Sequence, residues 1–162
     1  MKLFKNVRLK GSKELKMILV ENGKIKQIAE QICVPKETEV IDLQGYLVVP
    51  PYVDPHIHLD YVFTARKEGA LNGTGTLFEG IQRWSETKSD LTVEEVKQRA
   101  IAGIKKEMTA GVQYIRTHAD VTDPNFTSLK ALLELREELK DLVTIQVVAF
   151  PQEGMYAYKG GD

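Results

Sequence analysis

Two of the three histidines in this 162-residue chain, His56 and His58, lie one residue apart, at the end of a run that is typical of a β-strand, LVVPPYV. Side chains alternate between the two faces of a strand, so residues two apart point the same way. The spacing therefore predicts that both imidazoles aim at one point, as two ligands of a single metal ion must. Imidazole suits zinc, iron, nickel and copper, although H-x-H alone is not a specific signature.

The surroundings of the two histidines are more specific than the pair itself. A hydrophobic strand follows IDLQG, is broken by two prolines and an acid, and continues as H-x-H-x-D. This segment resembles the first barrel strand of the amidohydrolase superfamily, although Pro51 stands where most of the superfamily has a glycine. The form PPYVDPHIHLD resembles the cytosine deaminase branch in particular. That resemblance implies that His56 and His58 bind a catalytic divalent metal, iron or zinc.

The same resemblance implies two substrate-binding residues. Gln152, in FPQEG, would hydrogen-bond the pyrimidine, and Leu77, in GTLFEG, would line the pocket. A carboxamide offers a donor and an acceptor side by side, which can pair with an adjacent ring N–H and carbonyl of cytosine. The implied reaction is hydrolytic deamination of an amino-heterocycle by a metal-bound hydroxide. Without the resemblance, Gln152 would be interpreted as a loop residue that caps backbone groups.

Three further polar residues lie at or just after the ends of predicted strands. Asp60 either orients a ligand histidine from outside the metal's own ligand set or caps the following loop. His118 and Asp120, in RTHAD, share one strand face with Arg116, and we expect that face to point inward. A hydrogen-bonded structural pair is as good an interpretation of His118 and Asp120 as a direct role in the site.

Composition excludes several classes of partner. The net charge of −1 gives no reason to expect nucleic acid or an anionic membrane. The single cysteine, Cys33, excludes an internal disulfide and suits a reducing compartment. No apolar run reaches the ~18 residues of a transmembrane helix, and the first residues lack the apolar stretch of a signal peptide. We therefore expect a cytoplasmic protein.

Residues 1–49 contain short β-rich runs, with a two-residue Asn22-Gly23 loop between two of them that predicts a hairpin. By resemblance, this segment is part of the small β-sandwich that amidohydrolases carry beside their barrel. Residues 50–162 then form the second predicted domain.

In that domain the pattern is β-α-β-α-β, with strands near 48–58, 112–121 and 143–150. Thr76 and Thr92 begin capping-box patterns, and Phe78, Ile81 and Trp84 have helical spacing that suits a core. Asp123-Pro124 is typical of a helix start. Alternation of this kind favours a parallel sheet, so the fold class is α/β, a partial (β/α)8 TIM barrel with the first three strands. Eight strands take typically ~250 residues.

The resemblance also implies what these residues lack. The family's further histidine ligand, its catalytic glutamate and histidine, and the aspartate that completes the metal site lie on later strands. We therefore expect an N-terminal part with no catalytic residue of its own, a weakly or partially held metal and no activity alone. The alternative is a non-catalytic truncated relative that acts as a binding or structural module. Open sheet edges favour a homo-oligomer, most simply a symmetric dimer.

Overall fold

Two consecutive prolines, Pro50 and Pro51, separate the N-terminal strands from the rest of the chain. Neither has a backbone N–H to donate to a sheet, so the extended run expected over residues 48–58 is interrupted here. The computed structural model, which describes residues 1–156, divides at this point into two units, Met1–Pro50 and Pro51–Asp162. The predicted strand is accordingly split between them, as β5 (Leu47–Val48) and β6 (Tyr52–Ile57).

The N-terminal unit is a five-stranded sheet in the order β3-β2-β1-β4, with β5 also paired to β1. Its other strands are β1 (Lys2–Leu9), β2 (Lys16–Glu21), β3 (Lys24–Ala29) and β4 (Glu39–Asp42). β2 and β3 are antiparallel, and both residues of their loop, Asn22 and Gly23, have positive φ (50° and 73°). The predicted hairpin is confirmed, since a two-residue loop of this type needs positive φ at both positions.

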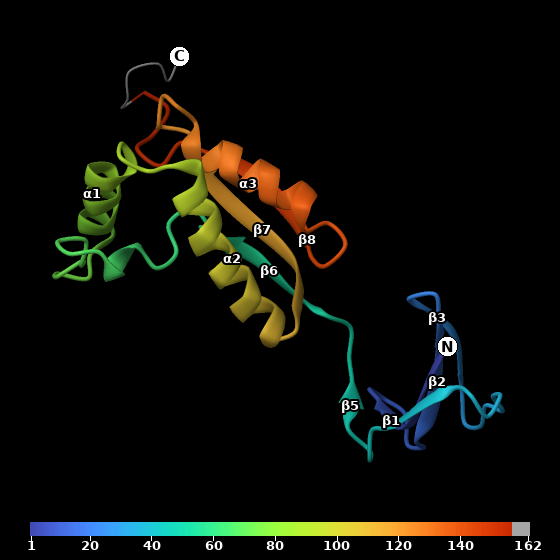
Figure 1. Ribbon diagram of the computed structural model, residues 1–162. Helices are drawn as coiled ribbons and strands as arrows, with labels where there is room; N and C mark the ends of the chain where they lie inside the picture. The colour runs from blue at the N-terminus through green and yellow to red at the C-terminus, as the bar shows by residue number, and fades with distance from the viewer. Residues whose placement is uncertain (157–162) are drawn as a thin grey trace. The chain divides into compact units, whose positions relative to one another are not determined.

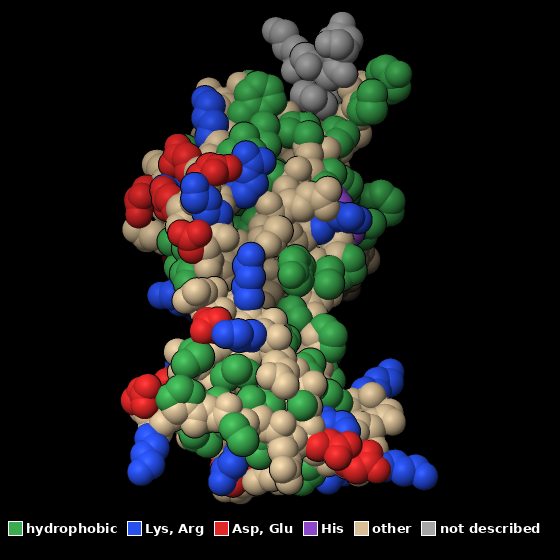
Figure 2. Space-filling model, turned by 90° about the vertical axis from the view of Figure 1, so that its right-hand side faces the viewer, with side chains coloured by type: hydrophobic (Ala, Val, Ile, Leu, Met, Phe, Trp, Pro, Cys, Tyr) green, Lys and Arg blue, Asp and Glu red, His purple; other side chains and the backbone are tan. Residues whose placement is uncertain are grey.

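Apolar side chains remain at the surface of the N-terminal unit (Figure 2). Ile25 is 63% exposed, Val40 51% and Leu47 55%. The residues of this unit form the one sheet, so the second layer of the expected β-sandwich is not among the residues that the structure describes. Surface that would be covered in a two-layer sandwich is therefore open to solvent here.

The second unit is built on a three-stranded parallel sheet in the order β6-β7-β8. β7 (Val112–Asp120) pairs with both β6 and β8 (Thr144–Phe150), each time in parallel. The helices are α1 (Leu77–Lys88), α2 (Val93–Thr109) and α3 (Thr127–Glu138), with a short 3-10 helix at Thr64–Arg66. α2 and α3 cover one face of the sheet, and α1 lies beside the ends of the strands (Figure 1). The predicted parallel strand order is confirmed.

The core of this unit lies between the sheet and the two covering helices. Ile104 of α2, Leu132 and Leu135 of α3 and Ile115 of β7 are all at most 2% exposed and belong to one cluster. Burying one such side chain stabilises the fold by about 1.5–3 kcal/mol. α2 begins with a complete capping box, in which Thr92 and Glu95 each accept from the other's backbone N–H. The capping box at Thr92 was predicted and is confirmed.

Two helix predictions need correction. Phe78 was placed with Trp84 in a core, yet Phe78 is 83% exposed and Trp84 only 3%, because only the second half of α1 packs against other elements. α3 was expected to start at Asp123-Pro124 but starts at Thr127. Asp123 instead accepts hydrogen bonds from the backbone N–H groups of Asn125 and Thr127, so its carboxylate caps a turn before the helix. Within residues 1–156, every helix is too short or too polar to span a bilayer.

Candidate active site

The three histidines of the chain lie together at the carboxyl end of the parallel sheet. His56 is in β6, His58 follows that strand directly, and His118 is in β7. The ring centroids of His56 and His58 are 5.4 Å apart, and the His118 ring stacks on His56 at 3.9 Å with an interplanar angle of 21°. His58 and His118 are 5.7 Å apart. Strands distant in sequence thus bring all three imidazoles to one place.

The electrostatics of this cluster favour the neutral form of the His58 and His118 rings. Burial lowers the pKa of His58, and the nearby His56 and His118 lower it further because cations would repel one another. Burial is also the main cause of the lowered pKa of His118, followed by His56. Neutral imidazole is the form that binds metal. The imidazoles therefore suit part of the ligand set of a divalent metal. Among residues 1–156, however, no group of three His, Cys, Asp or Glu side chains could hold an ion.

Asp60 is 1% exposed and lies two residues beyond His58. Its Oδ2 accepts the backbone N–H of Asp120 at 2.9 Å, so it caps the end of β7. Its Oδ1 has no hydrogen-bond partner and lies 4.0 Å from Nδ1 of His58, too far for a hydrogen bond. Burial raises the pKa of Asp60 to about 7, and the Asp120 charge adds to that effect. Neither role considered for Asp60 is a contact in the structure: the side chain bonds the backbone at the end of β7, neither the His58 ring nor the loop that follows Asp60.

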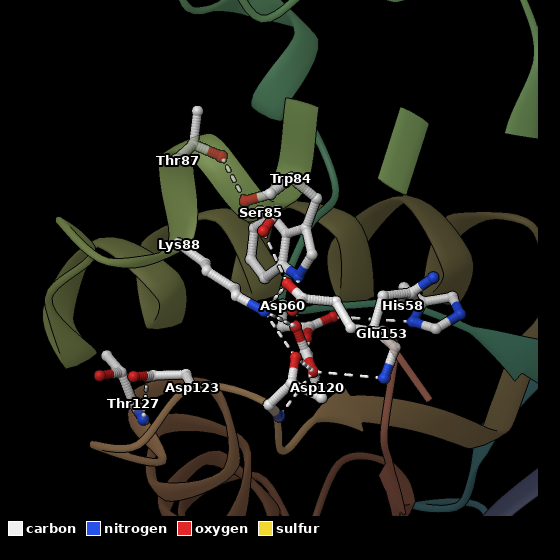
Figure 3. Close-up of polar contacts among 12 residues, drawn as sticks. His58, Asp60, Trp84, Ser85, Thr87, Lys88, Asp120, Asp123, Thr127 and Glu153 are labelled. Atoms are coloured by element: carbon white, nitrogen blue, oxygen red, sulfur yellow. Dashed lines mark hydrogen bonds and ion pairs between the residues drawn. The ribbon is translucent and has the colours of Figure 1, made fainter. Parts of the chain in front are cut away.

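Asp120, 1% exposed, is the acceptor at which several segments meet (Figure 3). Its Oδ2 accepts from the indole N–H of Trp84 at 2.7 Å and from Nζ of Lys88 at 3.3 Å. Its Oδ1 accepts from the N–H and the hydroxyl of Thr122, at 2.8 and 2.6 Å, and from the Gln152 N–H at 3.4 Å. Burial alone would raise the pKa of Asp120, but the Thr122 and Trp84 hydrogen bonds and the Lys88 charge outweigh it and lower the pKa. Asp120 is therefore a charged acceptor, separate from the His118 ring.

Lys88 joins α1 to the loops that follow the strands. The side chain is 8% exposed, and besides Asp120 its ammonium donates to Thr122 Oγ1 at 2.5 Å and to Glu153 Oε1. Ser85, one helical turn earlier on α1, donates to the same Glu153 oxygen at 2.6 Å. Figure 3 shows these side chains converging from α1 and from the ends of β7 and β8. The buried ammonium is thus fully paired, as a buried charge must be.

Of the two expected substrate-binding residues, Gln152 contacts this polar network and Leu77 does not. Gln152 is in the turn after β8, half-buried, and its backbone N–H is the group that reaches Asp120. Leu77 opens α1 and is 72% exposed. The first turn of α1 is held by Glu79, whose carboxylate accepts from the N–H groups of Gly73 and Thr74. Both residues are accessible for contact with a ligand.

Sequence reasoning missed several residues that build this region. The Thr117 side chain, 0% exposed, accepts the Leu59 N–H at 3.1 Å and so fixes the chain just after the histidine pair. Trp84 was taken as core only, and Lys88 and Glu153 were not singled out. One signal was available, because Trp84 and Lys88 are four residues apart and so share a helix face. Nothing local indicated that this face meets two carboxylates.

The model of the Amidohydrolase family matches residues 39–162 of this chain. The crystal structure of 5-methylcytosine deaminase from Klebsiella pneumoniae, liganded with 5-fluorocytosine, superposes with a TM-score of 0.88 and 42% sequence identity. That match covers 98% of this chain and 38% of the deaminase. The resemblance to the cytosine deaminase branch is thereby confirmed.

Two more distant similarities accompany it. N-isopropylammelide isopropyl amidohydrolase from Pseudomonas sp. (strain ADP) is 38% identical over 120 residues, which are 72% of this chain and 30% of that protein. The crystal structure of atrazine chlorohydrolase TrzN from Arthrobacter aurescens, complexed with zinc, superposes with a TM-score of 0.64. That match covers 92% of this chain and 35% of the chlorohydrolase. At 15% sequence identity it shows a shared fold and nothing more. The chain spans roughly a third of the length of the proteins it matches.

Proposed function

Because this chain belongs to the amidohydrolase family, we propose that it is the N-terminal part of a metal-dependent hydrolase of the cytosine deaminase branch. The reaction would be the hydrolytic removal of an amino group from an amino-heterocycle such as cytosine. The observation that carries the proposal is the gathering of His56, His58 and His118 at the carboxyl end of a parallel sheet. In α/β barrels this end of the strands holds the active site.

In this proposal β6, β7 and β8 are the first three strands of a (β/α)8 barrel. The helices cover one face of the sheet, which leaves Val53 62% and Tyr114 47% exposed on the face that a closed barrel would turn inward. The N-terminal sheet, with its exposed apolar residues, would be part of a β-sandwich. The lone Cys33, which forms no disulfide, agrees with a place in the cytoplasm.

His56 and His58 would hold the metal, with zinc and iron both suited to two imidazoles. When bound, a divalent metal supplies Lewis acidity and lowers the pKa of water. Other residues of this chain would orient the metal ligands and the substrate. His118 stacks against His56 and would fix the plane of that ring. The Gln152 carboxamide would pair with the N–H and carbonyl of the ring, and the apolar Leu77 would pack against the heterocycle.

The chain alone would have no deaminase activity in this proposal. His56, His58 and His118 are all of its histidines, so the remaining ligands and the general acid–base would come from outside residues 1–162. A positioned acid–base is worth about 10²–10⁴-fold in rate. A second candidate is a non-catalytic module that associates with itself or with a complementing chain. The observation that favours it is the exposed sheet face, together with the outer edges of β6 and β8, which pair with no strand among the described residues.

Metal binding tests the first half of the proposal. Calorimetric titration with Zn²⁺ should show a weak site whose affinity falls at least tenfold in the double variant His56→Ala, His58→Ala. His118→Gln should change the affinity much less, since within residues 1–156 His118 completes no group of three side chains that could hold one ion. Equal zinc affinity in wild type and double variant would remove this site from the proposal.

Ligand binding tests the second half. With zinc present, the ¹⁹F signal of 5-fluorocytosine should broaden on addition of the chain, and Gln152→Ala should abolish the broadening. Gln113→Ala, at an exposed glutamine near the other end of β7, is the matched control and should leave it unchanged. Ammonia release from cytosine by the purified chain, lost in His58→Ala, would show instead that residues 1–162 are catalytically sufficient.

A further inference from the structure

Lys88 is the buried cation of the second unit that contacts both of the polar loops at the carboxyl end of the sheet. Its ammonium donates to Asp120 at the end of β7, to Thr122 two residues later, and to Glu153 after β8. A lysine that is 8% exposed is uncommon, because an unpaired buried charge is costly. Here each of the three N–H groups of the ammonium has an acceptor, so the hydrogen bonds hold the side chain in a single conformation.

The contacts of Lys88 enclose the backbone of Gln152. The neighbouring Glu153 is held by Lys88 and Ser85, and the Gln152 N–H reaches Asp120, the other carboxylate that Lys88 contacts. A further hydrogen bond, from the Gly154 N–H to the Pro151 carbonyl, closes the turn. The turn is therefore attached to the rest of the unit at the Gln152 N–H and at the Glu153 side chain.

α1 makes the Glu153 attachment directly and also donates to Asp120, the acceptor of the other attachment. Trp84, Ser85 and Lys88 all lie in the second half of that helix, and each donates to Asp120 or Glu153. The same helix begins with Leu77, the other residue proposed to contact the heterocycle. A helix is stiff along its length, so a displacement of its second half would move its first turn as well. The network thus couples the two ligand-contacting positions.

We infer that Lys88 is the positioning residue for Gln152: through Glu153 and Asp120 it holds the turn of residues 151–154 in register with α1. The inference rests on the proposed function for the role of Gln152, but the ordering of the turn is a property of this chain by itself. The Lys88 ammonium is already paired with Asp120, Thr122 and Glu153, so in this inference it would touch neither the heterocycle nor the metal. It would act on affinity for the heterocycle by fixing where the Gln152 carboxamide sits.

A merely structural ion pair would give a different result from a positioning residue. Loss of a structural pair lowers the stability of the whole unit and raises hydrogen exchange at every amide that opens by global unfolding. Loss of a positioning contact raises exchange locally, at the turn, while core amides keep their protection. Site-resolved exchange therefore separates the two roles.

The experiment uses the 162-residue chain and two variants. Lys88→Met keeps the length of the side chain and removes the ammonium, and Glu153→Gln weakens the pair while keeping an acceptor for Ser85. Glu153 is 25% exposed in its side chain, so this second variant should fold even if the first does not. Lys97→Met is the matched control, since Lys97 also contacts two carboxylates, Glu134 and Glu138, but far from the turn and between α2 and α3.

We expect exchange at the Gln152 and Gly154 amides to rise about tenfold in Lys88→Met and severalfold in Glu153→Gln, with core amides such as Ile145 unchanged in the second variant. Affinity for 5-fluorocytosine should fall in the same order, and Lys97→Met should change neither. Unchanged exchange at Gln152 in both variants would overturn the inference. So would a rise that is the same at Gln152 and at Ile145.

The ligand measurement distinguishes the two proposals. If the wild-type chain does not bind 5-fluorocytosine but the exchange result holds, the proposed function fails and the ordering of the turn by Lys88 stands. If the wild type binds and the variants with a loosened turn bind equally well, Lys88 does not position Gln152 for the ligand, and the inference is wrong.

Discussion

Replacing Asp120 with alanine should strongly destabilise the second unit, although Asp120 is a single polar residue at the end of a strand. The carboxylate is 1% exposed and accepts hydrogen bonds from α1, from the segment after β7 and from the turn after β8. Alanine leaves these donors in place and removes their common acceptor. The site is closed to bulk solvent, since Asp120, Trp84 and Lys88 are each at most 8% exposed.

The magnitude follows from what each donor loses. The indole N–H of Trp84, in a side chain only 3% exposed, would be left without an acceptor, which costs about 1–3 kcal/mol. Lys88 would keep Glu153 and Thr122 but lose its deepest carboxylate, and removing one partner of a buried ion pair costs about 3–5 kcal/mol. These effects overlap, so we expect a total of about 3–5 kcal/mol, a large part of the 5–15 kcal/mol that stabilises a typical domain.

Trp84 is the only tryptophan of the chain, so its fluorescence reports directly on this region. Urea unfolding followed by that fluorescence, at one fixed protein concentration, would give the change in unfolding free energy. Asp141→Ala is the matched control: the residue is exposed, in the turn before β8, and should change stability by less than about 0.5 kcal/mol. A loss below about 1 kcal/mol for Asp120→Ala would refute the view that its carboxylate is the shared acceptor of a buried network.

Three other predictions concern a loop, the core and assembly. Hydrogen bonds from the Thr74 side chain and backbone lower the pKa of Glu79 to about 2. Because the folded-state pKa is lowered, the stabilisation by Glu79 is complete above its ordinary pKa of 4.5 and is lost as the pH falls toward 2. The amide chemical shifts of Gly73 and Thr74 should therefore titrate near pH 2 in the wild type and not in Glu79→Gln. Leu132→Ala, at a side chain 0% exposed, should cost about 2–5 kcal/mol in urea unfolding, whereas Leu133→Ala, at one 36% exposed, should cost under about 1 kcal/mol. Because its sheet face and edges are open, the wild-type chain should scatter light as a dimer or larger, and Val53→Lys should shift it toward monomer; a monodisperse monomeric wild type at high concentration would contradict this.

The sequence alone determined the elements whose causes are local. The Asn22-Gly23 loop needs positive φ at both positions and predicted its hairpin, and Thr92 with Glu95 predicted a helix start because each side chain satisfies the other's backbone. The order of strands and helices predicted a parallel sheet, because parallel neighbours need long crossovers. The motif around His56 and His58 led to the family that the comparisons show.

Tertiary structure decided which faces and which charges are buried. Helical spacing placed Phe78 and Trp84 together, but only contacts with distant segments put Trp84 inside and left Phe78 in solvent. Lys88 is buried because acceptors at Asp120 and Glu153, 32 and 65 residues away in sequence, meet at its ammonium. The local sequence reports the propensity of each segment and the spacing of its apolar residues. Whether a charged side chain is buried depends on partners that are distant in sequence and that only folding brings together.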